Sequence, residues 1–162
     1  MNTIYLVRHG IAEDTNLLRP DSERALTPEG IEKMHRIGQR LYQMGIQPNL
    51  IISSPYKRAV QTADILAEEL RYIGERFQDN RITPSARYES FSSLFQEYKS
   101  YREIMFVTHD PCVSILAGQL CGAATYNIEF KKGGVACIGI GRQNPPVGTL
   151  LWYAPPRVLI TE

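Results

Sequence analysis

Two of the three histidines in this 162-residue sequence follow short apolar stretches that are typical of buried strands. His9 follows residues 4–7 after one arginine, and His109 follows residues 104–107 after one threonine. Open α/β sheets bind their ligands just beyond the carboxyl ends of their strands. We therefore expect the two imidazoles to lie at one edge of a sheet, where a rigid scaffold presents them for chemistry.

Arginines occupy the same kind of position as these histidines. Arg8 precedes His9, and Arg58 follows the apolar run 50–52 after a short polar turn. A guanidinium stays charged at any working pH, and its planar fork matches phosphate oxygens. Viewed singly, these residues are also typical of ordinary strand ends and surfaces, so the prediction depends on their shared placement. Together they predict a phosphoryl-binding site, where Gly10 permits a sharp turn or a close ligand approach.

The residue types argue against other kinds of site. Arginine charges would repel a metal ion and the histidines lack an obvious third donor, so we expect no metal and no cofactor. The sequence contains no P-loop, and Gly139 and Gly141 lack the third glycine of a dinucleotide fingerprint. Cys112 lacks the downstream arginine that a cysteine phosphatase needs. A histidine nucleophile is the remaining chemistry.

The composition predicts one ordinary globular domain, residues 1–162, with 43% hydrophobic and 22% charged residues. The net charge of +1 provides no global field for nucleic acid or an anionic membrane, so any anion site must be local. Three cysteines without a close pair argue against a disulfide framework and favour a cytoplasmic setting. We find no signal-peptide pattern and no apolar run of about 18 residues that would predict a membrane span.

The elements that must position these side chains alternate between strands and helices. We predict strands at 4–7, 50–52 and 104–107, a weak strand near 86–88, and an antiparallel hairpin of 135–140 with 149–153. Helices are predicted at 28–44, 59–70, 90–101 and 112–121. This order is typical of a three-layer αβα sandwich with a mostly parallel central sheet.

The segment between Gly10 and Thr27 is polar and irregular over about 15 residues, which is long for a loop in a compact domain. It ends where Thr27 and Pro28 form a typical helix start. Long loops in compact domains are often functional, so we expect residues 13–20 to form the rim of the pocket.

Taken in order, the motifs resemble those of the histidine phosphatase superfamily, also called phosphoglycerate mutase-like, and within it the small SixA-type phosphohistidine phosphatases. The resemblance spans most of the chain and rests on Arg8-His9-Gly10, Arg24-x-Leu26-Thr27-x-x-Gly30, Ser53-Ser54-Pro55-x-x-Arg58-Ala59-x-Gln61-Thr62 and Thr108-His109-x-Pro111. It implies a phosphoglycerate mutase-like fold and His9 as the residue that is phosphorylated during turnover. It further implies Arg8 and Arg58 as the phosphate clamp, Arg24 as an additional phosphate contact and His109 as the second histidine of the pocket.

The function that this resemblance implies is hydrolysis of phosphohistidine in a protein, through a phosphohistidine intermediate on His9. The partner would be a phosphohistidine-bearing protein such as a phosphotransfer domain or a phosphocarrier, with phosphate and its analogues as inhibitors. Larger members carry a glutamate that protonates an alcohol leaving group, and Glu89 is the one candidate here. We place Glu89 at the margin of the pocket, either as a participant or as an ordinary surface acid.

Two alternatives remain open at the level of the sequence. The first is a phosphatase or mutase for small phosphate esters, which would use the same histidine and arginines. The second is a phosphate-binding module without catalytic activity. The presence of both His9 and His109 argues against the module, because the arginines alone could bind phosphate.

Overall fold

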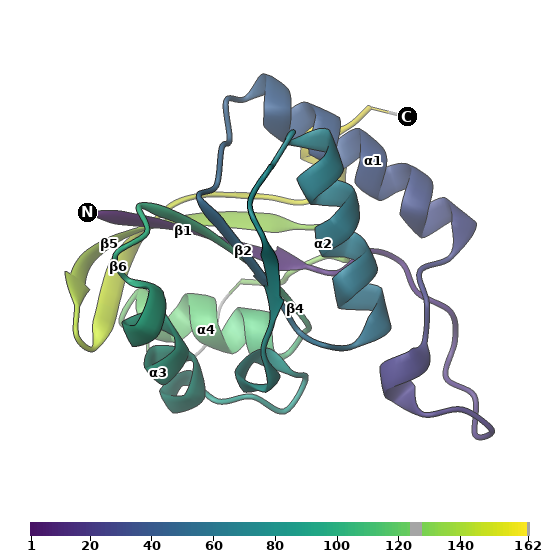
Figure 1. The fold of residues 1–162 in the computed structure, drawn as a ribbon, viewed down its shortest axis with the longest axis horizontal. Coiled ribbons are helices and arrows are strands. Elements are labelled where there is room, and N and C mark those ends of the chain that lie inside the picture. The colour runs from purple at the N-terminus through teal and green to yellow at the C-terminus, as the bar shows by residue number, and fades with distance from the viewer. Residues whose placement is uncertain (124–127, 162) are drawn as a thin grey trace.

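The computed structural model describes residues 1–123 and 128–161, which form a six-stranded sheet with the order β3-β2-β4-β1-β5-β6 (Figure 1). Strands β3, β2, β4 and β1 run parallel to their neighbours, whereas β5 is antiparallel to β1 and β6 is antiparallel to β5. The strands are β1 (Asn2–Arg8), β2 (Leu50–Ser53), β3 (Arg76–Gln78), β4 (Glu103–Thr108), β5 (Val135–Gln143) and β6 (Pro146–Ala154). The prediction of a mostly parallel central sheet is confirmed.

Helices cover both faces of this sheet, with α1 and α2 on one side and α3 and α4 on the other (Figure 1). Their bounds are α1 (Pro28–Gln43), α2 (Lys57–Glu69), α3 (Tyr88–Tyr98), α4 (Cys112–Leu120) and α5 (Pro156–Leu159), with 3-10 turns η1 (Asp21–Glu23) and η2 (Asn80–Ile82). Among residues 1–123 and 128–161, none of the helices has the length and apolar character needed to cross a membrane. Because helices cover both faces of the sheet, the predicted three-layer αβα sandwich is confirmed.

Alternation along the strands divides the core into two layers, because successive side chains point to opposite faces of a sheet. Val7 and Met105 pack with the layer beneath α1 and α2, whereas Leu6 and Phe106 pack with the layer beneath α3 and α4. All four side chains are fully buried. Strands buried on both faces are near-continuous apolar runs, which explains why β1 and β4 were recognisable in the sequence.

The start of α1 follows the predicted capping pattern. Thr27 Oγ1 accepts a hydrogen bond from the Gly30 N–H at 3.0 Å, and Pro28 occupies the first helical position. A Cβ atom on Gly30 would lie 2.1 Å from the carbonyl oxygen of Ile11, so only glycine fits at this contact. The helix is thereby packed directly against the backbone that leaves β1.

The predicted strand near 86–88 is wrong. Arg87 alone is extended there, as the residue that caps α3, and the helix begins at Tyr88. The strand that the sequence analysis did not predict is β3, which pairs with β2 at the edge of the sheet. All three of its residues are exposed, so it carries no apolar pattern and is defined only by pairing.

Two segments are more ordered than their sequences indicate. The β5–β6 hairpin is confirmed at the sheet edge, but its strands extend to Gln143 and Pro146. The loop after Gly10 is closed at its base by an antiparallel bridge between Ala12 and Leu26. The loop is therefore not a free connection, and we call the segment between these two residues, 12–26, the arm.

Candidate active site

The parallel pairing of β1 with β4 places the two histidine motifs side by side. Arg8 lies opposite Thr108 in the register, so His9 and His109 follow a matched pair of residues. The His9 N–H donates to the Thr108 carbonyl oxygen at 3.0 Å. On the other side of β4, the Ser54 N–H donates to the Val107 carbonyl oxygen at 2.9 Å. Three motifs distant in sequence therefore meet at one edge of the sheet.

His9 is held in one orientation by its own turn. Its side chain is buried, and Nδ1 lies 2.7 Å from the Gly10 carbonyl oxygen. A carbonyl oxygen only accepts, so Nδ1 carries the proton of the neutral ring and Nε2 carries the lone pair. Arg58 Nε donates toward that Nε2 at 3.3 Å. His9 thus presents a nucleophilic nitrogen directly to a guanidinium group.

His109 lies beside His9, with ring centroids 5.1 Å apart and an angle of 61° between the ring planes. Its Nε2 is 2.7 Å from Ser54 Oγ, and the Tyr56 ring packs edge-on at 5.0 Å. His109 is 1% exposed, and its Nδ1 has no hydrogen-bond partner among the described residues. A buried polar nitrogen without a partner costs free energy, which makes this atom an unusual feature of the site.

Arg58 is the buried cation of the site, at 3% exposure in the first turn of α2. Its guanidinium carbon lies 5.1 Å from the centroid of the Tyr56 ring, within the range of cation–π attraction. Beyond His9, it bonds to Asp21, where Nη1 donates to the carbonyl oxygen at 2.8 Å and Nη2 to Oδ2 at 3.0 Å. Arg58 thus connects the nucleophile to the long loop.

Arg24 reaches the same cluster from the loop. Its Nε donates to Asp21 Oδ1 at 2.8 Å, and its Nη1 donates to the Glu13 carbonyl oxygen at 2.7 Å. Asp21 therefore joins two guanidinium groups, a role that the sequence reasoning missed. The only signal was an acid three residues before Arg24 in a loop predicted to be functional.

Arg8 and Gly10 lie on either side of the nucleophile. Arg8 is half-buried and donates from Nη1 to the Phe130 carbonyl oxygen at 2.7 Å, while its Nε has no partner among the described residues. A Cβ atom on Gly10 would lie 2.7 Å from Met34 Cγ. Gly10 is therefore required by packing against α1, whereas the sequence had suggested a turn or ligand contact.

Two polar residues of the Arg58 motif tie the other motifs together. Thr62 Oγ1 accepts from the Gly10 N–H at 3.1 Å and donates to the Arg58 carbonyl oxygen at 2.8 Å. Gln61 Oε1 accepts from the Leu26 N–H at 2.7 Å. These bonds hold the β1 turn, the loop and α2 together next to His9 and Arg58.

Glu89 is not joined to this cluster. It lies exposed in the first turn of α3 and makes no hydrogen bond or ion pair with any described residue. The structure thus brings His9, His109, Arg58 and Arg24 into a connected group and places Arg8 next to it, without a carboxylate from α3.

Burial and positive charge keep both histidines neutral. Burial lowers the pKa of His9 to about 4, and the charges of Arg58, Arg8 and Arg24 act in the same direction. Burial lowers the pKa of His109 to about 3, assisted by its neighbours His9 and Arg58. A neutral His9 keeps its lone pair available at neutral pH, as a nucleophile requires.

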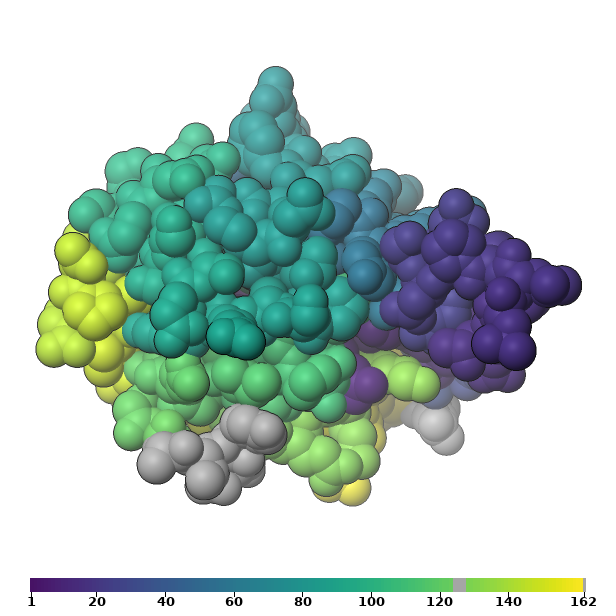
Figure 2. All heavy atoms as spheres, turned by 90° about the horizontal axis from the view of Figure 1, so that it is seen from below, coloured from purple at the N-terminus to yellow at the C-terminus, as the bar shows by residue number. Residues whose placement is uncertain are grey.

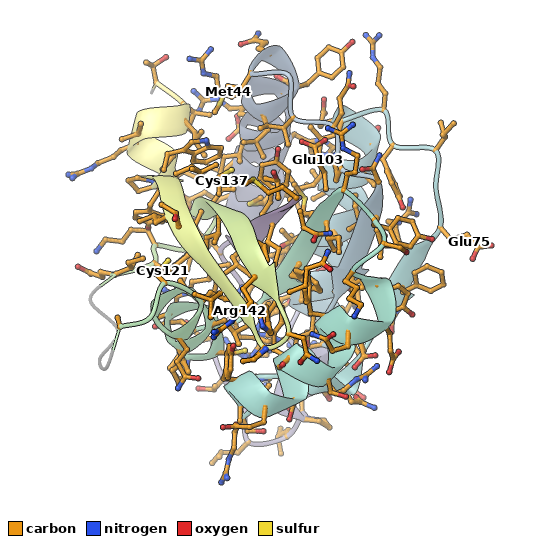
Figure 3. All side chains as sticks on the ribbon, turned by 90° about the vertical axis from the view of Figure 1, so that its left-hand side faces the viewer. Met44, Glu75, Glu103, Cys121, Cys137 and Arg142 are labelled. Atoms are coloured by element: carbon orange, nitrogen blue, oxygen red, sulfur yellow. The ribbon has the colours of Figure 1, made fainter. Side chains whose placement is uncertain are left out.

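The remaining candidates for chemistry lie apart from this site. The three cysteines are free, and Figure 3 shows Cys121 and Cys137 on different elements around the β5–β6 hairpin. Burial raises the pKa of the Cys112 thiol, which disfavours the reactive thiolate. His35, the third histidine, lies on α1, and its Nδ1 lies 2.8 Å from Oε1 of Glu69 on α2.

Comparison with known sequences identifies relatives with this arrangement of motifs. The family model of the histidine phosphatase superfamily (branch 1) matches residues 4–82. An uncharacterized protein of Picosynechococcus sp. is 31% identical over 136 residues, which cover 82% of this chain and 81% of the relative. The mitochondrial serine/threonine-protein phosphatase Pgam5 of Drosophila ananassae is 40% identical over 73 residues, covering 45% of this chain and 25% of that protein. A 2,3-bisphosphoglycerate-dependent phosphoglycerate mutase of Thermobifida fusca is 37% identical over 71 residues, covering 43% of this chain and 29% of the mutase.

Solved structures share the fold over nearly the whole chain. The protein histidine phosphatase SixA complexed with tungstate superimposes with a TM-score of 0.86 at 22% identity, covering 96% of this chain and 97% of that one. A mycobacterial glucosyl-3-phosphoglycerate phosphatase with inorganic phosphate gives 0.76 at 15% identity, covering 98% and 100%. A phosphoserine phosphatase mutant from Entamoeba histolytica with phosphoserine gives 0.74 at 16% identity, covering 99% and 100%. The phosphoglycerate mutase-like fold is thereby confirmed, while at these identities the likeness concerns the fold alone.

The lowered pKa of His9 predicts how its ring titrates. The ordinary histidine pKa is 6.5, so His9 should remain neutral, with the proton on Nδ1, until the pH approaches about 4. Long-range nitrogen–proton NMR spectra of the His9 ring would measure both the tautomer and the titration midpoint. Arg58→Ala should raise that midpoint, because it removes a cation that disfavours the imidazolium. A wild-type midpoint near 6.5 would contradict this electrostatic description.

Proposed function

The chain belongs to the histidine phosphatase superfamily, and we propose that it hydrolyses phosphohistidine in protein substrates through a phosphohistidine intermediate on His9. The observation that carries the proposal is the neutral His9, whose Nε2 faces Arg58 beside the buried His109. Binding of phosphate alone would not require a buried, uncharged base at the centre of a cationic cluster. The geometry therefore favours catalysis over simple binding.

The first step transfers the phosphoryl group to the enzyme. His9 Nε2 attacks phosphorus in line, the bond from phosphorus to the substrate imidazole breaks, and its electron pair returns to that imidazole nitrogen. Arg58, Arg24 and Arg8 bind the equatorial oxygens, where negative charge is spread in the transition state. His109 lies next to His9 and can donate a hydrogen bond to the same oxygens.

The second step regenerates the enzyme. Water attacks the phosphorus of phosphorylated His9, the bond between phosphorus and Nε2 breaks, and His9 recovers its lone pair. The protons of water remain with the products, which are inorganic phosphate and the neutral imidazole. The Gly10 carbonyl oxygen accepts a hydrogen bond from the Nδ1–H group throughout, so the ring keeps one orientation in both steps.

The leaving group supports a phosphohistidine substrate. An alcohol leaves poorly unless an acid protonates it, whereas an imidazole is a far better leaving group and needs less assistance. Glu89, the candidate acid, makes no hydrogen bond or ion pair with the described histidines or arginines of the site. A phosphohistidine substrate, whose leaving group needs little help from an acid, therefore fits this site better than a phosphate ester.

The arm at the edge of the site supports a protein substrate. Leu17 and Leu18 at its tip are essentially fully exposed, at 106% and 93% of their reference areas. The turn that presents them is ordered by Asn16, whose Oδ1 accepts from the Leu18 N–H at 2.8 Å. Figure 2 shows this N-terminal segment, in purple, as a lobe that projects from one side of the molecule. Because the same segment carries Asp21 and Arg24, a protein that reaches His9 would pass beside the two leucines.

A phosphatase or mutase for small phosphate esters is the second candidate. It is favoured by the names of several relatives, which include a phosphoglycerate mutase and a glucosyl-3-phosphoglycerate phosphatase. Such an enzyme would use His9 and the arginines in the same way. The two functions differ in the leaving group of the substrate and in the part of the protein surface that the substrate contacts.

A substrate panel tests the function directly. The wild-type protein should hydrolyse a phosphorylated phosphotransfer domain or phosphocarrier with higher kcat/KM than phosphoglycerate or sugar phosphates. His9→Ala should abolish turnover and the acid-labile phosphoenzyme while inorganic phosphate still binds, as measured by mass spectrometry and calorimetry. Comparable efficiency on small esters would favour the second candidate, and turnover by His9→Ala would refute the mechanism.

The phosphate clamp predicts a specific loss for one arginine. Arg58→Ala should lower kcat roughly 10²–10³-fold, as expected for removal of one preorganised charge-stabilising donor. Lys57→Ala is the matched control, because the neighbouring Lys57 is exposed and has no ion pair among the described residues. Steady-state kinetics on one phosphohistidine protein would compare the two. Equal effects of both substitutions would show that Arg58 acts only as surface charge.

The exposed leucines predict a defect that depends on the size of the substrate. The double substitution Leu17→Asp and Leu18→Asp should raise KM for a phosphohistidine protein about tenfold, as for loss of an apolar contact. Turnover of phosphoramidate, which is too small to reach the two leucines while it binds the arginines, should be unchanged. Ile73→Asp is the control, since Ile73 is equally exposed at 101% but lies on the connection after α2. An unchanged KM for the protein substrate would remove the arm from substrate binding.

A further inference from the structure

Asp21 occupies the edges of two guanidinium groups that would otherwise bind phosphate. Arg58 donates from Nη1 to the Asp21 carbonyl oxygen at 2.8 Å and from Nη2 to Oδ2 at 3.0 Å. Arg24 donates from Nε to Oδ1 at 2.8 Å. One residue thus holds both arginines through three different oxygens.

This arrangement determines which side of Arg58 faces the nucleophile. With Nη1 and Nη2 bound to Asp21, the remaining Nε points to His9 Nε2 at 3.3 Å. A guanidinium is planar and rigid, so fixing one edge fixes the other. The orientation of Arg58 toward His9 therefore depends on Asp21.

The two partners differ in burial. The Arg58 side chain is 4% exposed, whereas the Asp21 side chain is 47% exposed. A buried charge needs a partner, while a half-exposed carboxylate is solvated by water when it moves aside. Asp21 can therefore stabilise the buried Arg58 while its own carboxylate stays partly solvated.

Asp21 also sets the charge of the pocket. Arg8, Arg24 and Arg58 are cationic, and burial keeps the two histidines neutral. With the Asp21 carboxylate included, two positive charges remain, which balance a phosphate dianion. Without it, the site would bind the product phosphate with one excess positive charge.

We propose that Asp21 is a positioning residue of this phosphatase, which orients Arg58 toward His9 and limits the affinity of the site for product phosphate. The proposal rests on the phosphatase chemistry proposed above and is independent of whether the leaving group is an imidazole. It assigns a function to the arm beyond its role at the rim, because η1 carries the counter-ion of the clamp.

Asp21→Asn tests the proposal, because it removes the charge and leaves a side chain of the same shape. Glu23→Gln is the matched control, since Glu23 is exposed on the same 3-10 turn and has no ion pair among residues 1–123 and 128–161. Asp21→Asn should bind inorganic phosphate about tenfold more tightly, as expected for loss of one nearby negative charge. Its kcat with phosphoramidate should fall about tenfold or more through misorientation of Arg58. Glu23→Gln should stay within about twofold of wild type in both measurements, as is usual for surface substitutions.

Tighter phosphate binding together with lower kcat is a combination that general damage to the arm does not produce. If kcat fell while phosphate bound equally or more weakly, the proposal would be overturned, because loss of loop order explains that result. Equal behaviour of the two variants would overturn it as well. If the wild-type protein hydrolysed no phosphorylated compound, the proposed function would fail, and this outcome is separate because it is seen before either variant is compared.

Discussion

The site depends on the parallel pairing of β1 with β4. The register places Arg8 opposite Thr108, and the hydrogen bond from the His9 N–H to the Thr108 carbonyl extends the ladder by one residue. Both strands are buried on both faces, so a slip of one residue would exchange the two core layers and is strongly disfavoured. The 5.1 Å separation of the two imidazole rings is therefore maintained by the most stable part of the fold.

Around this pair of strands, the positive charges come from three different elements. Arg58 extends from the first turn of α2, Arg24 from the arm, and Arg8 from the end of β1. Burial lowers the pKa values of His9 and His109, and the arginines reinforce this effect on both. The arginine charges can lie close together because Asp21 forms ion pairs with Arg24 and Arg58 and offsets part of the positive charge. The same arrangement is ready for an anion without reorganisation of the scaffold.

Members of this superfamily with the same fold act on different phosphorylated compounds, so the fold alone does not determine the substrate. In the proposed function the features that bear on the substrate lie outside the histidine pair. Glu89 makes no hydrogen bond or ion pair among the described residues, and Leu17 and Leu18 are exposed on the arm. Both features concern the leaving group and the surface that approaches the site rather than the chemistry at phosphorus. Substrate selection is therefore separable from the transfer reaction.

Local patterns in the sequence determined the elements that carry the site. The buried runs of β1, β2 and β4 are recognisable because strands covered on both faces are apolar throughout. The cap at Thr27 and the stripe on α1 are equally local, as are the positions of His9 and His109 directly after β1 and β4. These signals were sufficient to predict the layer architecture and the meeting of His9, Arg58 and His109.

Only the tertiary structure decided the features that depend on pairing between distant residues. Strand β3 carries no apolar pattern and exists through its bonds with β2. Gly10 is required by Met34, and Asp21 acquires its role only where Arg58 and Arg24 converge. Sequence patterns report burial and backbone preference, which are properties of neighbouring residues. The partner of a polar side chain is determined by the packing of whole elements, and for that reason the counter-ion of the site was not visible in the sequence.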